Sequence, residues 1–132
     1  MTLYVDSSAL LKRYVDEHDS AVAVELMGTD PVLVTSRVTE IEVRRNLARL
    51  LDGDAWTDSR RQFAIDLDAF ALVGLDATTC NEAAAIAERT GCRSLDALHL
   101  GSAVRAGAAT VLTFDVRQAQ AGRAIGLTVI GA

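Results

Sequence analysis

Four acidic residues occur where an alternation of strands and helices could bring them together. Asp6 and Asp115 each follow a short apolar run, while Glu42 and Asp96 lie near the starts of two helical patterns. Carboxylates gathered at one point repel one another and need a cation, and an all-oxygen ligand set suits Mg²⁺ or Mn²⁺. Such an ion activates water and neutralises charge on a phosphoryl group, so the acids predict metal-assisted phosphate chemistry.

The elements that must position these acids are short apolar strands separated by helices. We predict strands over residues 2–5, 32–35, 71–75, 110–113 and 128–130. We predict helices over residues 9–17, 21–27, 37–51, 57–70, 79–90, 95–106 and 116–125, with Ser36 and Ser94 as caps, a loop at 28–31 and a turn at 52–54. This alternation indicates a parallel sheet covered on both faces. Asp6 and Asp115 would then share the carboxyl edge of the sheet, where open α/β folds bind ligands.

Each acid also has an ordinary structural explanation. Asp6, Asp96 and Asp115 all stand where acids cap helices or favour the helix dipole. Glu42 shares an arc of its predicted helix with Arg45, Asn46 and Arg49, so an ion-paired surface stripe is its alternative. The shared sheet edge is what favours a functional site.

Glu40 points in a different direction from Glu42, because it is two residues away on the same predicted helix. Arg44 follows it one turn later. We therefore predict that Glu40 forms a structural ion pair with Arg44.

Composition limits the class of protein. The chain has 132 residues, half of them hydrophobic, and one proline, which predicts a single globular domain over residues 1–132. No run approaches the roughly 20 apolar residues of a membrane span, and no basic segment precedes an apolar one at the start, so we expect a cytoplasmic protein without a membrane anchor. Cys80 and Cys92 are predicted to be reduced thiols, and His18 and His99 lack zinc-ligand spacing.

The charge does not favour nucleic acid as a whole. The formal net charge is −5, but twelve of the thirteen basic residues are arginine, the residue best suited to phosphate recognition. A biased genome composition would give the same count. Arg45, Arg49, Arg60 and Arg61 are candidate phosphate contacts, with ordinary solvated helix faces as the alternative.

Four short motifs resemble those of the PIN-domain family. Residues 6–12, Asp-Ser-Ser-Ala-Leu-Leu-Lys, are similar to its opening motif, and Glu42 stands at the acid of its second motif. Residues 95–100 are similar to its DAxHL motif, and residues 113–115 to its TxD motif. The motifs follow the family order and span nearly the whole chain. The DAxHL form most resembles VapC-type toxins of bacterial toxin–antitoxin pairs, although Ser7 stands where threonine is common.

The resemblance implies a compact three-layer α/β/α PIN-like fold with a short parallel sheet, and a Mg²⁺- or Mn²⁺-dependent endoribonuclease. It assigns metal binding and catalysis to Asp6, Glu42, Asp96 and Asp115, with the Ser7 and Thr113 hydroxyls supporting them. It also implies an RNA substrate, a homodimer, and a VapB-type antitoxin whose tail occupies the active site.

Three other interpretations bear on this assignment. His99, one turn after Asp96, is predicted to be a packed core histidine rather than a catalytic one. A non-catalytic PIN-like module that binds RNA or a protein partner is the alternative function. A haloacid-dehalogenase-like phosphatase is disfavoured, because Ser8 stands where that family needs an aspartate two residues after its nucleophile.

Overall fold

The computed structural model describes residues 2–29 and 32–132, and its centre is a five-stranded sheet in the order β3-β2-β1-β4-β5. The strands are β1 (Thr2–Val5), β2 (Val32–Ser36), β3 (Ala71–Val73), β4 (Thr110–Thr113) and β5 (Thr128–Gly131). All neighbouring strands are parallel, and β1 lies between β2 and β4, with Tyr4 opposite both Val34 and Val111. The predicted parallel sheet is therefore confirmed, and Asp6 and Asp115 follow adjacent strands at one edge.

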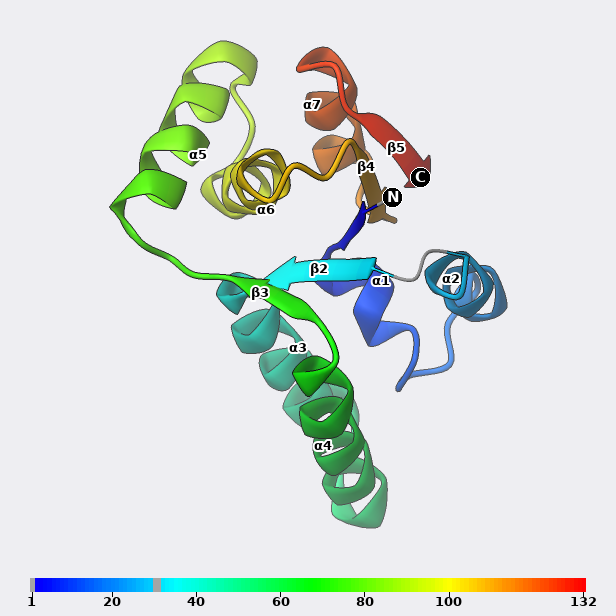
Figure 1. Cartoon of the computed structure of the whole chain (residues 1–132). Helices are drawn as coiled ribbons and strands as arrows, with labels where there is room; N and C mark the ends of the chain where they lie inside the picture. Colours follow the sequence, from blue (N-terminus) through cyan, green and yellow to red (C-terminus); the bar gives the residue numbers. More distant parts are fainter. Residues whose placement is uncertain (1, 30–31) are drawn as a thin grey trace.

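Helices cover both faces of the sheet (Figure 1). On one face lie α1 (Ser7–Leu11), α2 (Ser20–Met27), α3 (Arg37–Leu50) and α4 (Gly53–Asp68); on the other lie α5 (Ala77–Thr90), α6 (Ser94–Arg105) and α7 (Val116–Ala124). The central strand β1 serves both layers, because its side chains alternate between the faces. Leu3 and Val5 join the core beneath α1 to α4, whereas Tyr4 joins the core beneath α6 and α7.

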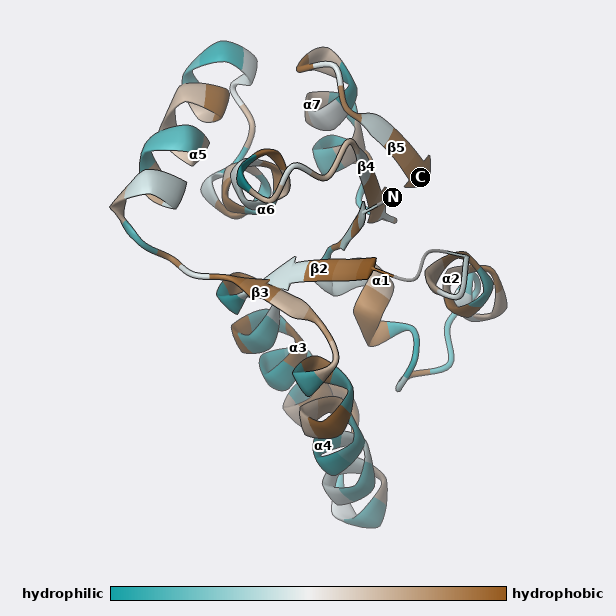
Figure 2. Cartoon of the chain, viewed as in Figure 1, coloured by the Kyte–Doolittle hydropathy of each residue, from teal (hydrophilic) through white to brown (hydrophobic). Residues whose placement is uncertain are grey.

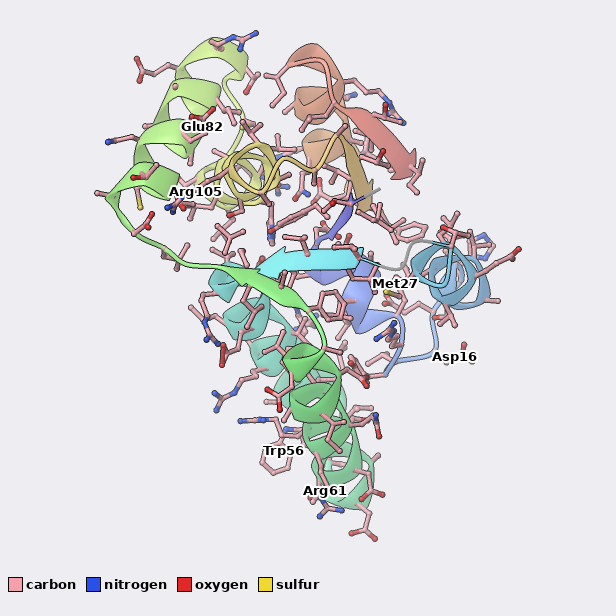
Figure 3. All side chains as sticks on the ribbon, in the orientation of Figure 1. Asp16, Met27, Trp56, Arg61, Glu82 and Arg105 are labelled. Carbon is pink, nitrogen blue, oxygen red and sulfur yellow. The ribbon has the colours of Figure 1, made fainter. Side chains whose placement is uncertain are left out.

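The distribution of hydropathy agrees with this three-layer arrangement. The central strands are largely hydrophobic, while polar residues gather on the outer helices (Figure 2). The helices α3 and α4 form a hairpin that extends away from the sheet, and Trp56 and Arg61 lie toward its far end (Figure 3). None of the helices in the described part of the chain is long and apolar enough to cross a membrane. Cys80 and Cys92 are free thiols, as predicted.

Several predicted boundaries are wrong, each for a local reason. The first helix ends at Leu11 rather than near residue 17, because the amides of residues 12–14 donate to carbonyls three residues back and form a tight turn. The helix α4 already begins at Gly53, so it includes the turn predicted at 52–54. The third strand stops at Val73 rather than residue 75. The loop predicted at 28–31 lies partly outside the described residues.

The predicted helix caps also differ. Ser94 is the first residue of α6, and Arg93 occupies the cap position. Ser36 precedes α3 as predicted, but its hydroxyl forms no cap bond and instead accepts a hydrogen bond from Tyr4. The cap that the sequence analysis missed is Asp76, which accepts from the amide of Thr79 at the start of α5. The predicted stop at Gly91 is confirmed, since its φ of 71° is a left-handed conformation that glycine adopts easily.

Candidate active site

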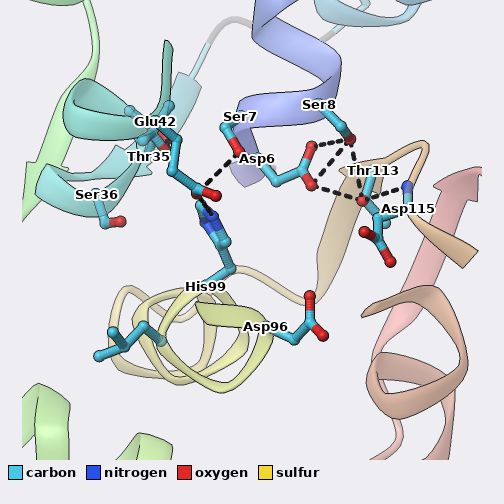
Figure 4. Close-up of polar contacts among 12 residues, drawn as sticks. Asp6, Ser7, Ser8, Thr35, Ser36, Glu42, Asp96, His99, Thr113 and Asp115 are labelled. Carbon is cyan, nitrogen blue, oxygen red and sulfur yellow. Dashed lines mark hydrogen bonds and ion pairs between the residues drawn. The ribbon is translucent and has the colours of Figure 1, made fainter. Parts of the chain in front are cut away.

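Asp6 is fixed where β1 ends and α1 begins. Its carboxylate accepts from the amide of Ala9 at 2.9 Å, from the Ser8 hydroxyl at 2.7 Å and from the Thr113 hydroxyl at 2.6 Å (Figure 4). Only 2% of Asp6 is exposed, and burial raises the pKa of its carboxyl, although His99 and these hydrogen bonds lower it. The donors therefore hold the carboxylate in one orientation at the sheet edge.

Glu42 reaches the same edge from the second turn of α3. The Ser7 hydroxyl donates to its Oε1 at 2.9 Å, and His99 Nε2 contacts the same oxygen at 2.6 Å. Burial raises the pKa of Glu42, but the hydrogen bond and charge of His99 outweigh burial, so the pKa lies below its ordinary value. No hydrogen bond or ion pair of the described residues uses Oε2, so that oxygen is available to a ligand.

His99 is buried, as predicted, but it also supports the site. Burial lowers the pKa of His99, whereas Tyr4, Glu42 and Asp6 raise it, and the result is a pKa of about 10. The Tyr4 hydroxyl donates to Ser36 Oγ at 3.1 Å, so it accepts at its 2.8 Å contact with His99 Nδ1. Because Nε2 faces the Glu42 carboxylate, which can only accept, both ring nitrogens act as donors. This chain gives Glu42 a buried positive partner.

Asp96 and Asp115 share one arginine that the sequence analysis did not single out. Arg93 donates to both oxygens of Asp96, at 2.8 and 3.2 Å, and to Asp115 Oδ2 at 2.9 Å. Burial raises the pKa of Asp115, but the amide of Gln118 and the Arg93 guanidinium outweigh it and leave the pKa below its ordinary value. The two carboxylates raise the pKa of Arg93 in turn.

One cavity of about 290 Å³ brings these groups together, and we call it the acid cavity. Its walls include all four predicted acids, which are Asp6, Glu42, Asp96 and Asp115. Among the described residues, no three acids, cysteines or histidines lie close enough to hold a metal ion as they stand. The donor chemistry fits a hard divalent cation, because every candidate ligand is a carboxylate oxygen. Arg93 supplies the positive charge between Asp96 and Asp115.

The supporting hydroxyls divide between two acids. Ser7 contacts Glu42, and Thr113 contacts Asp6. Ser8 was missed, although its position two residues after a helix-capping aspartate is a readable signal for a contact with that aspartate. Its hydroxyl bonds Asp6 and accepts from the amide of Phe114, which joins the ends of β1 and β4.

Gln118 was also missed, and the sequence holds no local signal for it. It is 2% exposed and lines the acid cavity. Its Nε2 is the buried side-chain nitrogen or oxygen that lacks a hydrogen-bond partner in the described part of the molecule. Buried donors are rarely left unpaired, so this atom calls for an explanation.

The four arginines predicted to contact RNA do not line the acid cavity; they are Arg45, Arg49, Arg60 and Arg61. Within the predicted stripe, Asn46 binds the backbone oxygen of Glu42, and Arg49 binds the side chain of Asn46. The predicted Glu40–Arg44 pair is wrong. Glu40 binds Arg37 at 2.7 Å instead, because a residue three positions earlier is also a neighbour on the helix surface.

Fold and site together define a class: α/β/α proteins with one parallel sheet and a carboxylate-lined cavity at its carboxyl edge. The family model described as PIN domain matches residues 3–124. Ribonuclease VapC46 of Mycobacterium tuberculosis is 31% identical over 130 residues, which cover 97% of this chain and 95% of that relative. The chain therefore belongs to the PIN-domain family, in its VapC-type branch.

Solved structures agree on the fold. VapC20 of Mycobacterium tuberculosis, described as a Sarcin-Ricin loop cleaving toxin, aligns with a TM-score of 0.75 at 21% identity over 91% of this chain and 95% of that one. A toxin–antitoxin complex from Klebsiella pneumoniae contains a chain that aligns with a TM-score of 0.70 at 15% identity, over 90% of each chain. At these identities the likeness concerns the fold alone.

Proposed function

We propose that this protein is the toxin of a VapC-type toxin–antitoxin pair and hydrolyses RNA phosphodiester bonds with Mg²⁺ or Mn²⁺. The observation that carries the proposal is the acid cavity itself, where carboxylates from β1, α3, α6 and the end of β4 converge at one sheet edge. The relative VapC46 is named a ribonuclease, and VapC20 is described as a Sarcin-Ricin loop cleaving toxin, which supports the same activity.

In this proposal Asp6, Glu42, Asp96 and Asp115 hold the metal. A bound divalent ion supplies a water of lowered pKa and neutralises charge on the phosphoryl oxygens. Ser8 and Thr113 orient the Asp6 carboxylate, while Ser7 and His99 hold Glu42 by Oε1 and leave its Oε2 facing the ligand. Arg93 binds the same oxygens of Asp96 and Asp115 that would hold the cation, so its guanidinium would compete with the ion for these two acids.

The partners follow from the same family membership. A VapB-type antitoxin covers the acid cavity with its tail, and two copies of this chain form a homodimer. The structural neighbour from a toxin–antitoxin complex supports the first of these assignments. Co-purification with the protein encoded by a neighbouring small open reading frame tests the antitoxin assignment. The mass of the isolated chain in solution tests the homodimer.

The decisive experiment is cleavage of bacterial RNA by the purified protein with Mg²⁺, with Mn²⁺ and with EDTA. Replacing Asp6→Asn removes a central ligand without changing side-chain volume, so cleavage should fall by about a hundredfold or more while the circular dichroism spectrum stays unchanged. Asp68→Asn is the matched control, since Asp68 is an exposed acid of α4 outside the cavity. Cleavage by Asp6→Asn at the wild-type rate would refute the site. Metal-independent RNA binding without cleavage would favour the non-catalytic module.

A further inference from the structure

A second cleft opens beside the acid cavity, and its charge is opposite. It has a volume of about 640 Å³ and runs between the end of α5, the start of α6 and the outer side of α7. Arg89, Arg93 and Arg117 line it, and Asp96 is the one acid among its described lining residues. We call it the arginine cleft. Arg93 and Asp96 line both spaces, so the cleft lies directly beside the acid cavity.

Two of the three guanidinium groups are unused by the fold. Arg93 is occupied by Asp96 and Asp115, but Arg89 and Arg117 are exposed and form no ion pair with any described residue. The Arg105 side chain, by contrast, is paired with Asp76 at the other end of α6. Unpaired arginines that converge on a cleft from two helices are expected to bind an anion, and a guanidinium fork matches phosphate oxygens.

Gln118 points to the same ligand from inside the acid cavity. Its buried, unpartnered Nε2 is a hydrogen-bond donor in a cavity that carboxylates otherwise dominate. Donors of this kind bind oxygen atoms, and a phosphate that approaches the acids along α7 brings such oxygens. The helix α7 therefore borders both spaces, because Arg117 lines the cleft and Gln118 lines the acid cavity.

We propose that the arginine cleft binds the phosphate backbone of the RNA strand on one side of the bond that is cut. This inference rests on the proposed ribonuclease function and adds the path of its substrate. No aromatic side chain is among the described residues that line the cleft, so the aromatic platforms on which single-stranded bases stack are missing there. We therefore expect the cleft to contact the RNA phosphates and to contribute no base specificity. It provides local positive charge in a protein whose net charge is −5.

The test measures binding of a labelled single-stranded RNA by fluorescence anisotropy at several salt concentrations. All proteins carry Asp6→Asn, so that bound RNA stays intact. The double variant Arg89→Gln/Arg117→Gln should bind about tenfold more weakly, and the slope of log Kd against log salt should fall by about 1.4, or about 0.7 for each lost phosphate contact. Arg89→Lys/Arg117→Lys should retain most of the affinity and the slope, because the charge remains.

Other variants and a second ligand separate the alternatives. Arg44→Gln removes one exposed, unpaired arginine from α3 and should bind as the parent does. Unchanged RNA affinity in the Arg89→Gln/Arg117→Gln variant would overturn the proposal. A larger loss of RNA affinity in Arg60→Gln/Arg61→Gln would also overturn it, and would place the RNA backbone on α4 instead. If the double variant keeps its affinity for RNA but loses affinity for a polyglutamate peptide, the cleft serves an acidic protein segment and the proposal is wrong.

Cleavage assays with Asp6 restored distinguish this inference from the function on which it rests. If the protein cuts RNA and the arginine changes leave RNA binding intact, the path is wrong and the ribonuclease stands. If the arginine changes weaken binding but the restored protein cuts nothing, the ribonuclease is wrong and the cleft stands as an RNA-binding surface. With both correct, Arg89→Gln/Arg117→Gln should raise KM for RNA about tenfold and leave kcat near the parent value.

Discussion

The two sides of the acid cavity hold their carboxylates by different means. Asp6 and Glu42 are held by hydroxyls, an amide and the buried ring of His99. Asp96 and Asp115 are held by Arg93, whose side chain is 52% exposed. A buried partner cannot leave without disturbing the core, whereas an exposed one exchanges readily for another cation or for solvent. We infer that the first side is a fixed frame and the second is where a ligand enters.

The largest expected effect is the difference in stability between variants of His99 and of Arg93, the positively charged side chains on the two sides of the cavity. His99→Ala removes a buried positive partner and leaves Glu42 with Ser7 alone and Tyr4 with Ser36 alone, so it should lower the free energy of unfolding by roughly 3 kcal/mol. Arg93→Gln removes an exposed positive charge and should cost under about 1 kcal/mol. Urea unfolding followed by circular dichroism measures both. Equal losses in the two variants would contradict the division into a fixed and an exchangeable side.

Metal affinity tests the side of the cavity that Arg93 holds. The Arg93 guanidinium and a divalent cation compete for Asp96 and Asp115, so Arg93→Gln should bind Mn²⁺ about fivefold more tightly, the equivalent of a strong exposed ion pair. Isothermal titration calorimetry of the metal-free protein gives the affinity directly. Arg44→Gln, with the same loss of charge away from the cavity, is the control. Weaker binding by Arg93→Gln would mean that Arg93 positions the two acids rather than competing for them.

The same contrast explains what could be predicted from the sequence. The strands are short and largely apolar and alternate with helices, so the parallel sheet and the shared edge of Asp6 and Asp115 were predictable. The burial of His99 was predictable too, but its contact with Glu42 was not, since the two residues are 57 positions apart. The contact of Arg93 with Asp96 was predictable, because the two residues are three positions apart on one helix start. Its bond to Asp115 was not, because those residues are 22 positions apart. Long-range side-chain contacts depend on packing, which local patterns do not contain.

Helix ends were the least predictable local feature, for a related reason. Serine is a common capping residue, so Ser36 and Ser94 were expected to cap their helices. Tertiary contacts decided otherwise. Ser36 accepts from Tyr4 in the chain that reaches Glu42, and Arg93 takes the cap position of α6 while its side chain binds the acids. Ser36 therefore keeps the predicted cap position without a cap bond, whereas Ser94 yields the cap position to Arg93.

Gln118 lies on the same side of the acid cavity as Asp115, which it follows by three residues on α7. Replacing it shows whether this side binds a ligand at a cost in folding stability. Gln118→Met keeps the approximate volume and removes the buried donor without a partner, so it should raise the free energy of unfolding by roughly 1 kcal/mol. The same change should weaken RNA binding, because Gln118 lines the acid cavity and its amide donor is lost. Thermal unfolding and RNA anisotropy on one preparation measure both. A variant that loses stability would show that the amide is satisfied within the fold.

The smallest effect concerns an exposed arginine–carboxylate pair outside the site. Arg105 and the amide of Thr79 lower the pKa of Asp76 to about 2, and the pair joins the start of α5 to the end of α6. Because the folded pKa is depressed, the contribution to stability is present above the ordinary value of 3.8 and is lost as the pH falls toward 2. Asp76→Asn keeps a good capping residue, so its deficit in unfolding free energy should be small and constant above about pH 5 and shrink between pH 4 and 2. Urea unfolding between pH 7 and 2 measures this deficit. Arg105→Gln is the control, since it removes the partner and should weaken the pH dependence of stability in the same way.

A deficit as large as that of His99→Ala would contradict the view that exposed pairs, Arg93 included, contribute little to folding.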